Sequence, residues 1–143
     1  MHSFYIEGPG AAGALARLLK EEARHASRVL RMRAGEEFTA LDGENRFLAE
    51  FVSLDDSGAE VLLKERLPDN EAPARLTVYQ GVAKADKLEL ISQKLTELGV
   101  SRLVPVRMAR SVAKMDGSGR ADRLDRIARE AAKQCRRARA SWP

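Results

Sequence analysis

The sequence has few cysteine, histidine and aromatic residues. One cysteine, two histidines and 5% aromatic residues occur among its 143 residues. The single Cys135 excludes an internal disulfide and a cysteine-rich metal site, which favours a reducing compartment. Neither His2 nor His25 has supporting ligands or a nucleophile at a suitable spacing, so no metal site is expected. With so few aromatic side chains, the core is expected to consist mainly of leucine, valine, isoleucine and alanine.

Long apolar runs and nucleotide-binding loops are also missing. No apolar run approaches the roughly 20 residues that span a bilayer. The first ten residues lack the basic and then apolar pattern of a signal peptide, so we expect a cytoplasmic protein with no membrane partner. Gly81 belongs to neither a G-x-G-x-x-G nor a G-x-x-x-x-G-K-[ST] pattern, so no phosphate-binding loop of these kinds is predicted.

Charge is distributed unevenly along the chain. Residues 1–101 carry 13 Lys and Arg against 17 Asp and Glu, whereas residues 102–143 carry 12 against 4. The balance therefore changes from −4 to +8, which indicates a polyanionic partner such as RNA. The alternative is a solvated arginine-rich helix without a partner.

The first 72 residues resemble a small β-barrel in their pattern. Turn residues at Asp42-Gly43 and at Asp55–Gly58 separate apolar segments, as in hairpins. Such spacing predicts a small antiparallel barrel. The predicted strands are Phe4–Ile6, Glu37–Leu41, Arg46–Leu54 and Ala59–Leu67, and the predicted helices are Ala11–Lys20 and His25–Met32.

The segment Pro68–Pro73 is predicted to be a linker, because it has two prolines and no large apolar residue. We therefore divide the chain into domains 1–72 and 73–143. The segment Arg75–Val82 predicts a strand, and Asp86 with Glu89 predicts a capping box at the start of a helix. An apolar stripe at helical spacing follows, formed by Leu88, Ile91, Leu95 and Leu98.

A second strand follows at about Leu103–Val106. A helical crossover between two strands predicts that they are parallel. A polar loop is expected at Ala113–Gly119, and a last helix at about Asp122–Arg137. That helix has an apolar face that includes Cys135, so a packed thiol is expected there. It also has a basic stripe, formed by Arg126, Arg129, Lys133 and Arg136 or Arg137.

Three groups of residues are candidates for contacts with RNA: a helical segment around Arg28, the sheet edge at Lys84 with Arg110, and the basic stripe of the last helix. Arg28 and Arg31 lie one helical turn apart, beside His25, and could contact successive phosphates. Lys84 and Lys87 lie at the end of a strand and the start of a helix, where α/β sheets commonly bind ligands. An ordinary solvated surface is the alternative for each group. The full set is His25, Arg28, Arg31, Lys84, Lys87, Arg110, Arg126, Arg129, Lys133 and Arg137.

Several segments of the sequence resemble those of one known protein family. The similar segments run from His25 to Arg139, and the most specific are TELGV at Thr96–Val100 and EAAKQCRR at Glu130–Arg137. They are similar to the bacterial enzymes that methylate N3 of a uridine in 16S ribosomal RNA of the small subunit. The resemblance implies an N-terminal PUA-like β-barrel, which binds RNA, followed by a SPOUT-type parallel α/β domain with a trefoil knot. It also implies S-adenosylmethionine as cofactor and a homodimer formed through the knot.

Family members continue for roughly another hundred residues, including a Gly-Pro-Glu-Gly-Gly stretch that this sequence lacks. We therefore expect the first half of the SPOUT domain, truncated before the knot, with no cofactor-binding residues, no metal and a missing dimer interface. No catalytic residue is assigned. The expected function is methylation of uridine N3 in 16S rRNA of the assembled small subunit, with this chain carrying the RNA-binding part and inactive alone. The alternative is an RNA-binding fragment without catalysis.

Overall fold

The computed structural model describes residues 1–110 and 118–141. The chain divides into two compact units, Met1–Asp69 and Asn70–Pro143, called unit 1 and unit 2 below. The division lies inside the Pro68–Pro73 segment that the sequence marks as a linker. The polar loop predicted at Ala113–Gly119 falls largely on residues 111–117, which lie outside the described residues.

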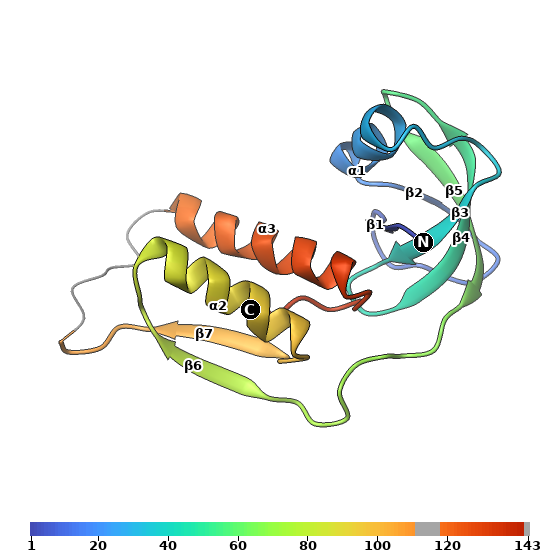
Figure 1. The fold of residues 1–143 in the computed structure, drawn as a ribbon. Coiled ribbons are helices and arrows are strands. Elements are labelled where there is room, and N and C mark those ends of the chain that lie inside the picture. Colours follow the sequence, from blue (N-terminus) through green and yellow to red (C-terminus); the bar gives the residue numbers. More distant parts are fainter. Residues whose placement is uncertain (111–117, 142–143) are drawn as a thin grey trace. The chain divides into compact units, whose positions relative to one another are not determined.

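Unit 1 is a curled five-stranded sheet in the order β1-β3-β4-β5-β2 (Figure 1). Its strands are β1 Ser3–Tyr5, β2 Leu15–Arg17, β3 Glu37–Leu41, β4 Arg46–Leu54 and β5 Ala59–Arg66. Neighbouring strands are antiparallel except β1 and β3, which are parallel. The prediction of an entirely antiparallel barrel is therefore wrong at this pair. A long connection, rather than a hairpin turn, joins these two strands and permits the parallel pairing.

The two outer strands of this sheet meet and close the barrel. Ile6, just after β1, forms an antiparallel bridge with Leu18, just after β2. The backbone N–H of Glu7 donates to the carbonyl of Arg17 at 2.8 Å, and that of Leu19 donates to Tyr5 at 3.2 Å. These bonds give partners to backbone groups that an open sheet would leave exposed at its edges.

The core of unit 1 contains a cluster of aromatic rings. Phe4, Phe38, Phe47 and Phe51 are each at most 2% exposed, and they are all the phenylalanines of the chain. The rings of Phe38 and Phe51 are stacked with centroids 4.4 Å apart, and Phe4 meets them edge-on at 5.3 and 6.0 Å. Most residues of this core are aliphatic, as expected, because Ile6, Leu18, Val61, Leu63 and five alanines share it with the four rings.

The helix predicted at Ala11–Lys20 is wrong. Gly13 has φ +82°, and Leu15–Arg17 pairs with β5 as β2. At Gly10 a Cβ atom would lie 2.8 Å from Cε2 of Phe47, so the chain approaches the core more closely than alanine would allow. Sheet pairing and this close approach override the local helix propensity. The helix α1 forms later, at Lys20–Arg24, and continues into the π-helical turn η1 at His25–Val29.

Unit 2 contains the parallel strands β6 Thr77–Gly81 and β7 Arg102–Val106, which confirms the predicted strand pairing. The helix α2, Ala85–Glu97, connects them and packs along α3, Ser118–Gln134 (Figure 1). Leu88 of α2 and Leu103 of β7 are fully buried, whereas Tyr79 of β6 is 73% exposed. Leu88 and Leu103 therefore lie in the interior of this unit, and Tyr79 lies at its surface.

Two helix ends differ from the predictions. The N-cap of α2 is Lys84, and Asp86 lies within the first turn without forming the predicted capping box. An acidic side chain there still interacts favourably with the helix dipole. The last helix ends at Gln134 rather than at Arg137, because Arg136 adopts a left-handed conformation with φ +60°. Among the described residues, no helix is long and apolar enough to cross a membrane.

Candidate RNA-binding surfaces

In unit 1, a short helical segment presents basic side chains at the surface. Ala23 and Ala26 are fully buried, so their small side chains let α1 and η1 lie close to the sheet. Arg24, His25 and Arg28 are exposed on the same segment. The ring of His25 packs edge-on against Phe4, with centroids 6.4 Å apart. The segment is therefore anchored by its apolar side and offers its cationic side to solvent.

Arg28 of this segment is ion-paired with Asp56 in the β4–β5 turn. Its Nη2 lies 2.8 Å from Oδ2 of Asp56, and the hydroxyl of Ser27 donates to Oδ1 at 3.2 Å. The hydrogen bond from Arg28 is the main reason that the pKa of Asp56 is lowered from its usual value. Both side chains are more than half exposed, and such pairs contribute little to stability. A phosphate group could therefore replace Asp56 as the partner of Arg28.

Arg31 lies just beyond η1 and is exposed. Its φ of +54° is uncommon for a residue other than glycine. The backbone N–H of the next residue, Met32, donates to the carbonyl of Ala26 at 3.0 Å. The structure thus places His25, Arg28 and Arg31 together on one segment. Arg24 was missed by the sequence analysis, although its spacing of four residues from Arg28 is the signal that could have identified it.

In unit 2, Lys84, Lys87 and Arg110 are exposed around the carboxyl ends of the parallel strands. Lys84 and Lys87 begin α2, whereas Arg110 follows β7. Arg120, at the start of α3, donates from Nη2 to the carbonyl of Ala83 at 2.8 Å, which ties α3 to the segment before α2. The sequence analysis did not identify Arg120 in this role.

The predicted basic stripe of α3 divides into different environments. Arg126 and Arg129 are exposed, and Arg129 is paired with Asp125 one turn earlier at 2.9 Å. Lys133 is paired with Glu130 at 2.8 Å, and its side chain is only 9% exposed. The N-terminal half of the stripe, with Arg126 and Arg129, therefore presents more positive charge to solvent than the half that contains Lys133. Arg123, which pairs with Glu89 of α2 at 2.7 Å, was missed by the sequence analysis.

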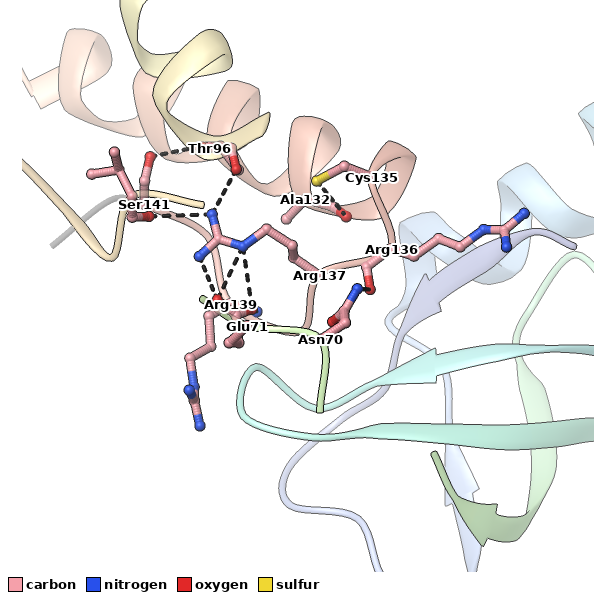
Figure 2. A network of polar contacts seen from close by, with 10 residues as sticks. Asn70, Glu71, Thr96, Ala132, Cys135, Arg136, Arg137, Arg139 and Ser141 are labelled. Carbon is pink, nitrogen blue, oxygen red and sulfur yellow. Dashed lines mark hydrogen bonds and ion pairs between the residues drawn. The ribbon is translucent and has the colours of Figure 1, made fainter. Parts of the chain in front are cut away.

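Arg137 is buried, and this corrects its prediction as an RNA contact. Its side chain is 5% exposed and is paired with Glu71, whose side chain is 8% exposed. Nη1 donates to the carbonyls of Thr96 at 2.6 Å and Val100 at 3.2 Å, and Nε donates to Glu71 (Figure 2). All these bonds lie inside unit 2. The guanidinium therefore joins the start of the unit to the end of α2 and cannot face a phosphate in solution.

Other polar contacts extend this buried network (Figure 2). The hydroxyls of Thr96 and Ser141 are 2.5 Å apart, and the amide of Asn70 donates to the carbonyl of Arg136 at 3.0 Å. Cys135 lies beside it, with Sγ 3.6 Å from the carbonyl of Ala132. The segment after α3 is thus fixed to both α2 and the first residues of the unit.

The structure allows a test of the cofactor that the resemblance implies. S-adenosylmethionine has a positively charged sulfonium. The described side chains at the carboxyl ends of β6 and β7 include the cationic Lys84, Lys87, Arg107 and Arg110 and one carboxylate, Asp86. The excess of positive charge suits a phosphate better than a sulfonium. These residues do not fit the cofactor, and we assign none of them to it. Among residues 1–110 and 118–141, no cluster of three or more His, Cys, Asp or Glu side chains could hold a metal ion.

The fold and these surfaces are those of a two-part protein. A closed barrel with an exposed arginine segment is followed by the parallel β-α-β unit of an α/β domain. Comparison with known protein families identifies the family to which the chain belongs. Residues 70–141, half of the chain, match the RNA methyltransferase domain, and residues 18–64 match the RNA methyltransferase PUA domain. The chain belongs to this RNA methyltransferase family.

Curated relatives are similar over most of this chain. Ribosomal RNA small subunit methyltransferase E of Bacillus subtilis is 34% identical over 119 residues, which cover 80% of this chain and 46% of the relative. The protein of the same name from Mycobacterium bovis is also 34% identical, over 95% of this chain and 53% of its own length. The chain thus spans about half the length of the curated relatives it matches.

Solved structures show the same fold. A ribosomal RNA small subunit methyltransferase E from Neisseria gonorrhoeae, bound to S-adenosylmethionine, matches with a TM-score of 0.87 and 30% identity. That match covers 98% of this chain and 60% of the other. A methyltransferase from Legionella pneumophila, also in complex with S-adenosylmethionine, matches with a TM-score of 0.86 and 26% identity, covering 99% and 61%.

Proposed function

We propose that this chain supplies the RNA-binding part of an S-adenosylmethionine-dependent methyltransferase whose substrate is 16S ribosomal RNA. The proposed target is N3 of a uridine in the assembled small subunit. The observation that carries the proposal is the match to RNA methyltransferase families in both units. Such a substrate would place the protein in the cytoplasm.

The chemistry of the target explains what the protein must supply. Uridine N3–H is weakly acidic, with an acidity near that of a tyrosine phenol, and the proton must leave when N3 is methylated. S-adenosylmethionine would supply the methyl group. Positive side chains near the base would stabilise the developing negative charge, and firm binding of the RNA would hold the base in line. We assign no catalytic base in this chain.

The proposed RNA contacts are the exposed cations described above. In unit 1 they are His25, Arg28 and Arg31, to which we add Arg24. In unit 2 they are Lys84, Lys87, Arg110, Arg126 and Arg129. Lys133 offers little surface, and Arg137 is withdrawn because it is buried.

A variant of Arg28 tests the proposed RNA contact in unit 1. Arg28→Gln keeps a side chain of similar length and removes one positive charge. For a single-stranded RNA, the slope of log affinity against log salt should become shallower by about 0.7 if one phosphate contact is lost. Arg33→Gln removes another exposed arginine, from outside the helical segment, and should change the slope less. Equal slopes for Arg28→Gln and the unaltered chain would contradict the contact.

The methyl-transfer part of the proposal needs its own assay. A full-length relative is mixed with labelled S-adenosylmethionine and with small subunits that lack the modification, and the label on the RNA is located. Label on uridine N3 supports the proposed target, and no label there contradicts it. For this chain itself, salt-sensitive RNA binding without heat of cofactor binding in calorimetry supports the second candidate, an RNA-binding protein without catalysis. The excess of cationic side chains at the strand ends, which would repel the sulfonium of the cofactor, favours this second candidate. A homodimer would give twice the chain mass of 15.8 kDa in sedimentation equilibrium.

A further inference from the structure

Unit 1 contains a cavity that none of the proposed RNA contacts occupies. Its volume is about 420 Å³, within the range of small-ligand sites. It lies where β2 leads into α1, beside the β4–β5 turn. Its lining includes Glu7, Arg17, Lys20, Ser53, Gly58 and Glu60.

The polar side chains of this cavity are available to a ligand. Within the described residues, Glu7, Arg17 and Lys20 make no side-chain hydrogen bond or ion pair, and the same holds for Ser53 and Glu60. Asp55 differs, because its carboxylate accepts from the backbone N–H groups of Ser57 and Gly58. Cations, carboxylates and a hydroxyl therefore line one space without neutralising each other.

This mixture of charges suits the edge of a nucleobase better than a phosphate. Glu7 and Glu60 would repel a phosphate, whereas a base edge presents donors and acceptors side by side. Uracil, for example, offers one N–H donor between two carbonyl acceptors. A carboxylate can accept from that N–H while Arg17, Lys20 or Ser53 donates to a carbonyl.

The cavity also adjoins the arginine segment. Asp55 lines the cavity, and the next residue, Asp56, pairs with Arg28 of η1 at 2.8 Å. One turn of the chain therefore borders both the cavity and the proposed phosphate contact. Phosphates along a strand position it, and base contacts add affinity that does not depend on charge.

We propose that this cavity binds one unstacked base of a single-stranded RNA whose adjoining phosphates contact Arg24 and Arg28. This inference rests on the proposed function, since it assumes that unit 1 binds RNA. Binding of a base in the cavity would fix the position of the strand along the helical segment.

Gly58 offers a direct way to fill the cavity. A Cβ atom there would have no heavy atom within 4 Å, and its φ lies outside the left-handed region. Gly58→Phe should therefore fold and occupy the space of the base. With a dodecamer of uridine, we expect affinity to fall about tenfold, as for loss of one or two hydrogen bonds to a base, with an unchanged salt slope. Leu15→Phe adds a ring at an exposed position of β2 outside the cavity and should leave affinity unchanged.

A dodecamer of abasic nucleotides gives the distinguishing readout. It keeps the phosphates and lacks every base, so the unaltered chain and Gly58→Phe should bind it equally. If Gly58→Phe fails to fold, Arg17→Gln replaces it, with Arg33→Gln as control. A Gly58→Phe chain that binds the uridine dodecamer as tightly as the unaltered chain overturns the cavity inference alone. An unaltered chain that binds neither oligomer at low salt overturns the proposed function as well.

Discussion

The interior of unit 1 contains a cluster of aromatic rings, whereas the described interior of unit 2 contains a buried arginine–glutamate pair. Unit 1 buries all four phenylalanines of the chain around a closed sheet. In unit 2, among the described residues, the ring of Tyr79 is largely exposed, while Arg137 and Glu71 are buried together. Closure of the barrel gives unit 1 a mainly apolar interior, in which Glu22 and Thr39 are also buried. Unit 2 instead relies on polar bonds to connect segments that are distant in sequence.

The two interiors should lose stability for different reasons when a buried side chain is replaced. Removing a ring from a core leaves a cavity into which the neighbouring side chains relax only partly, so the cost depends on how far the site can collapse. A buried ion pair is sensitive in a different way, because removing one partner leaves the other charged and without compensation. Substitutions in the two units should therefore differ in cost.

Arg137→Ala is expected to have the largest effect. It leaves the Glu71 carboxylate buried and removes donors from the carbonyls of Thr96 and Val100. The free energy of unfolding of unit 2 should fall by about 3–5 kcal/mol. Hydrogen exchange followed by mass spectrometry should show faster exchange in α2 and α3 and unchanged exchange in β3 to β5.

Arg136→Ala is the matched control for this variant. Arg136 is exposed, and alanine can follow the same left-handed backbone with no greater strain than arginine. Its effect should stay within about 0.5 kcal/mol. Equal exchange rates for the two variants would show that the buried pair does not hold unit 2 together.

Gly10→Ala should destabilise unit 1 by about 1–3 kcal/mol, the usual cost of overpacking a core. The added methyl would lie 2.8 Å from Cε2 of Phe47 and 2.9 Å from Cδ1 of Leu63. Gly119→Ala is the control in unit 2, because nothing lies within 4 Å of its Cβ position and alanine favours helices. Urea titration gives both values, and equal midpoints would refute the close approach at Gly10.

Asp42 predicts a pH dependence that is specific to unit 1. Burial raises the pKa of this carboxyl, but hydrogen bonds from the N–H groups of Asn45, Gly10 and Glu44 outweigh it, so the pKa is lowered from its usual value. A lowered folded pKa gives stability that is fully present above the unfolded pKa of about 3.9 and is lost as pH falls through the folded value.

The difference in unfolding free energy between the unaltered chain and Asp42→Asn should therefore shrink as pH falls below about 4. Urea titrations of both proteins at several pH values measure it, with exchange in β3 and β4 as the local readout. A difference that stays constant down to the lowest accessible pH would contradict the assigned hydrogen bonds.

Arg126→Gln should have the smallest effect on folding and a measurable effect on RNA. Its side chain is exposed on α3, in contrast to Arg137. We expect unchanged unfolding and a salt slope shallower by about 0.7 for single-stranded RNA. Titration of labelled RNA at several salt concentrations measures the slope. Reduced stability together with an unchanged slope would assign Arg126 to the fold rather than to the surface.

Regular local patterns allowed much of the fold to be predicted. The strands at Glu37–Leu41 and Arg46–Leu54 were predicted with the bounds that the structure has, because tight turns flank them. The parallel pairing of β6 and β7 followed from the helix between them. Ala11–Lys20 was misjudged, because its alanines and leucines favour a helix while pairing with β5, distant in sequence, decides its structure.

The surfaces were harder to predict than the strands. Arg137 belongs to the same basic run as Arg136, and local spacing does not show which of the two points inward. That depends on where the helix ends and on Glu71, which lies far away in sequence. The cavity of unit 1 was not predicted, because residues from three separated segments line it.

The most direct test of the account is the salt dependence of RNA binding by the unaltered chain. Affinity for a uridine dodecamer is measured at several salt concentrations from about 50 to 200 mM, a range over which phosphate contacts weaken markedly. The account predicts a straight line of log affinity against log salt, falling with a slope of about −2 to −4, which corresponds to roughly three to six phosphates. A flat line, or no binding at the lowest salt, would contradict an RNA-binding role for these exposed cations.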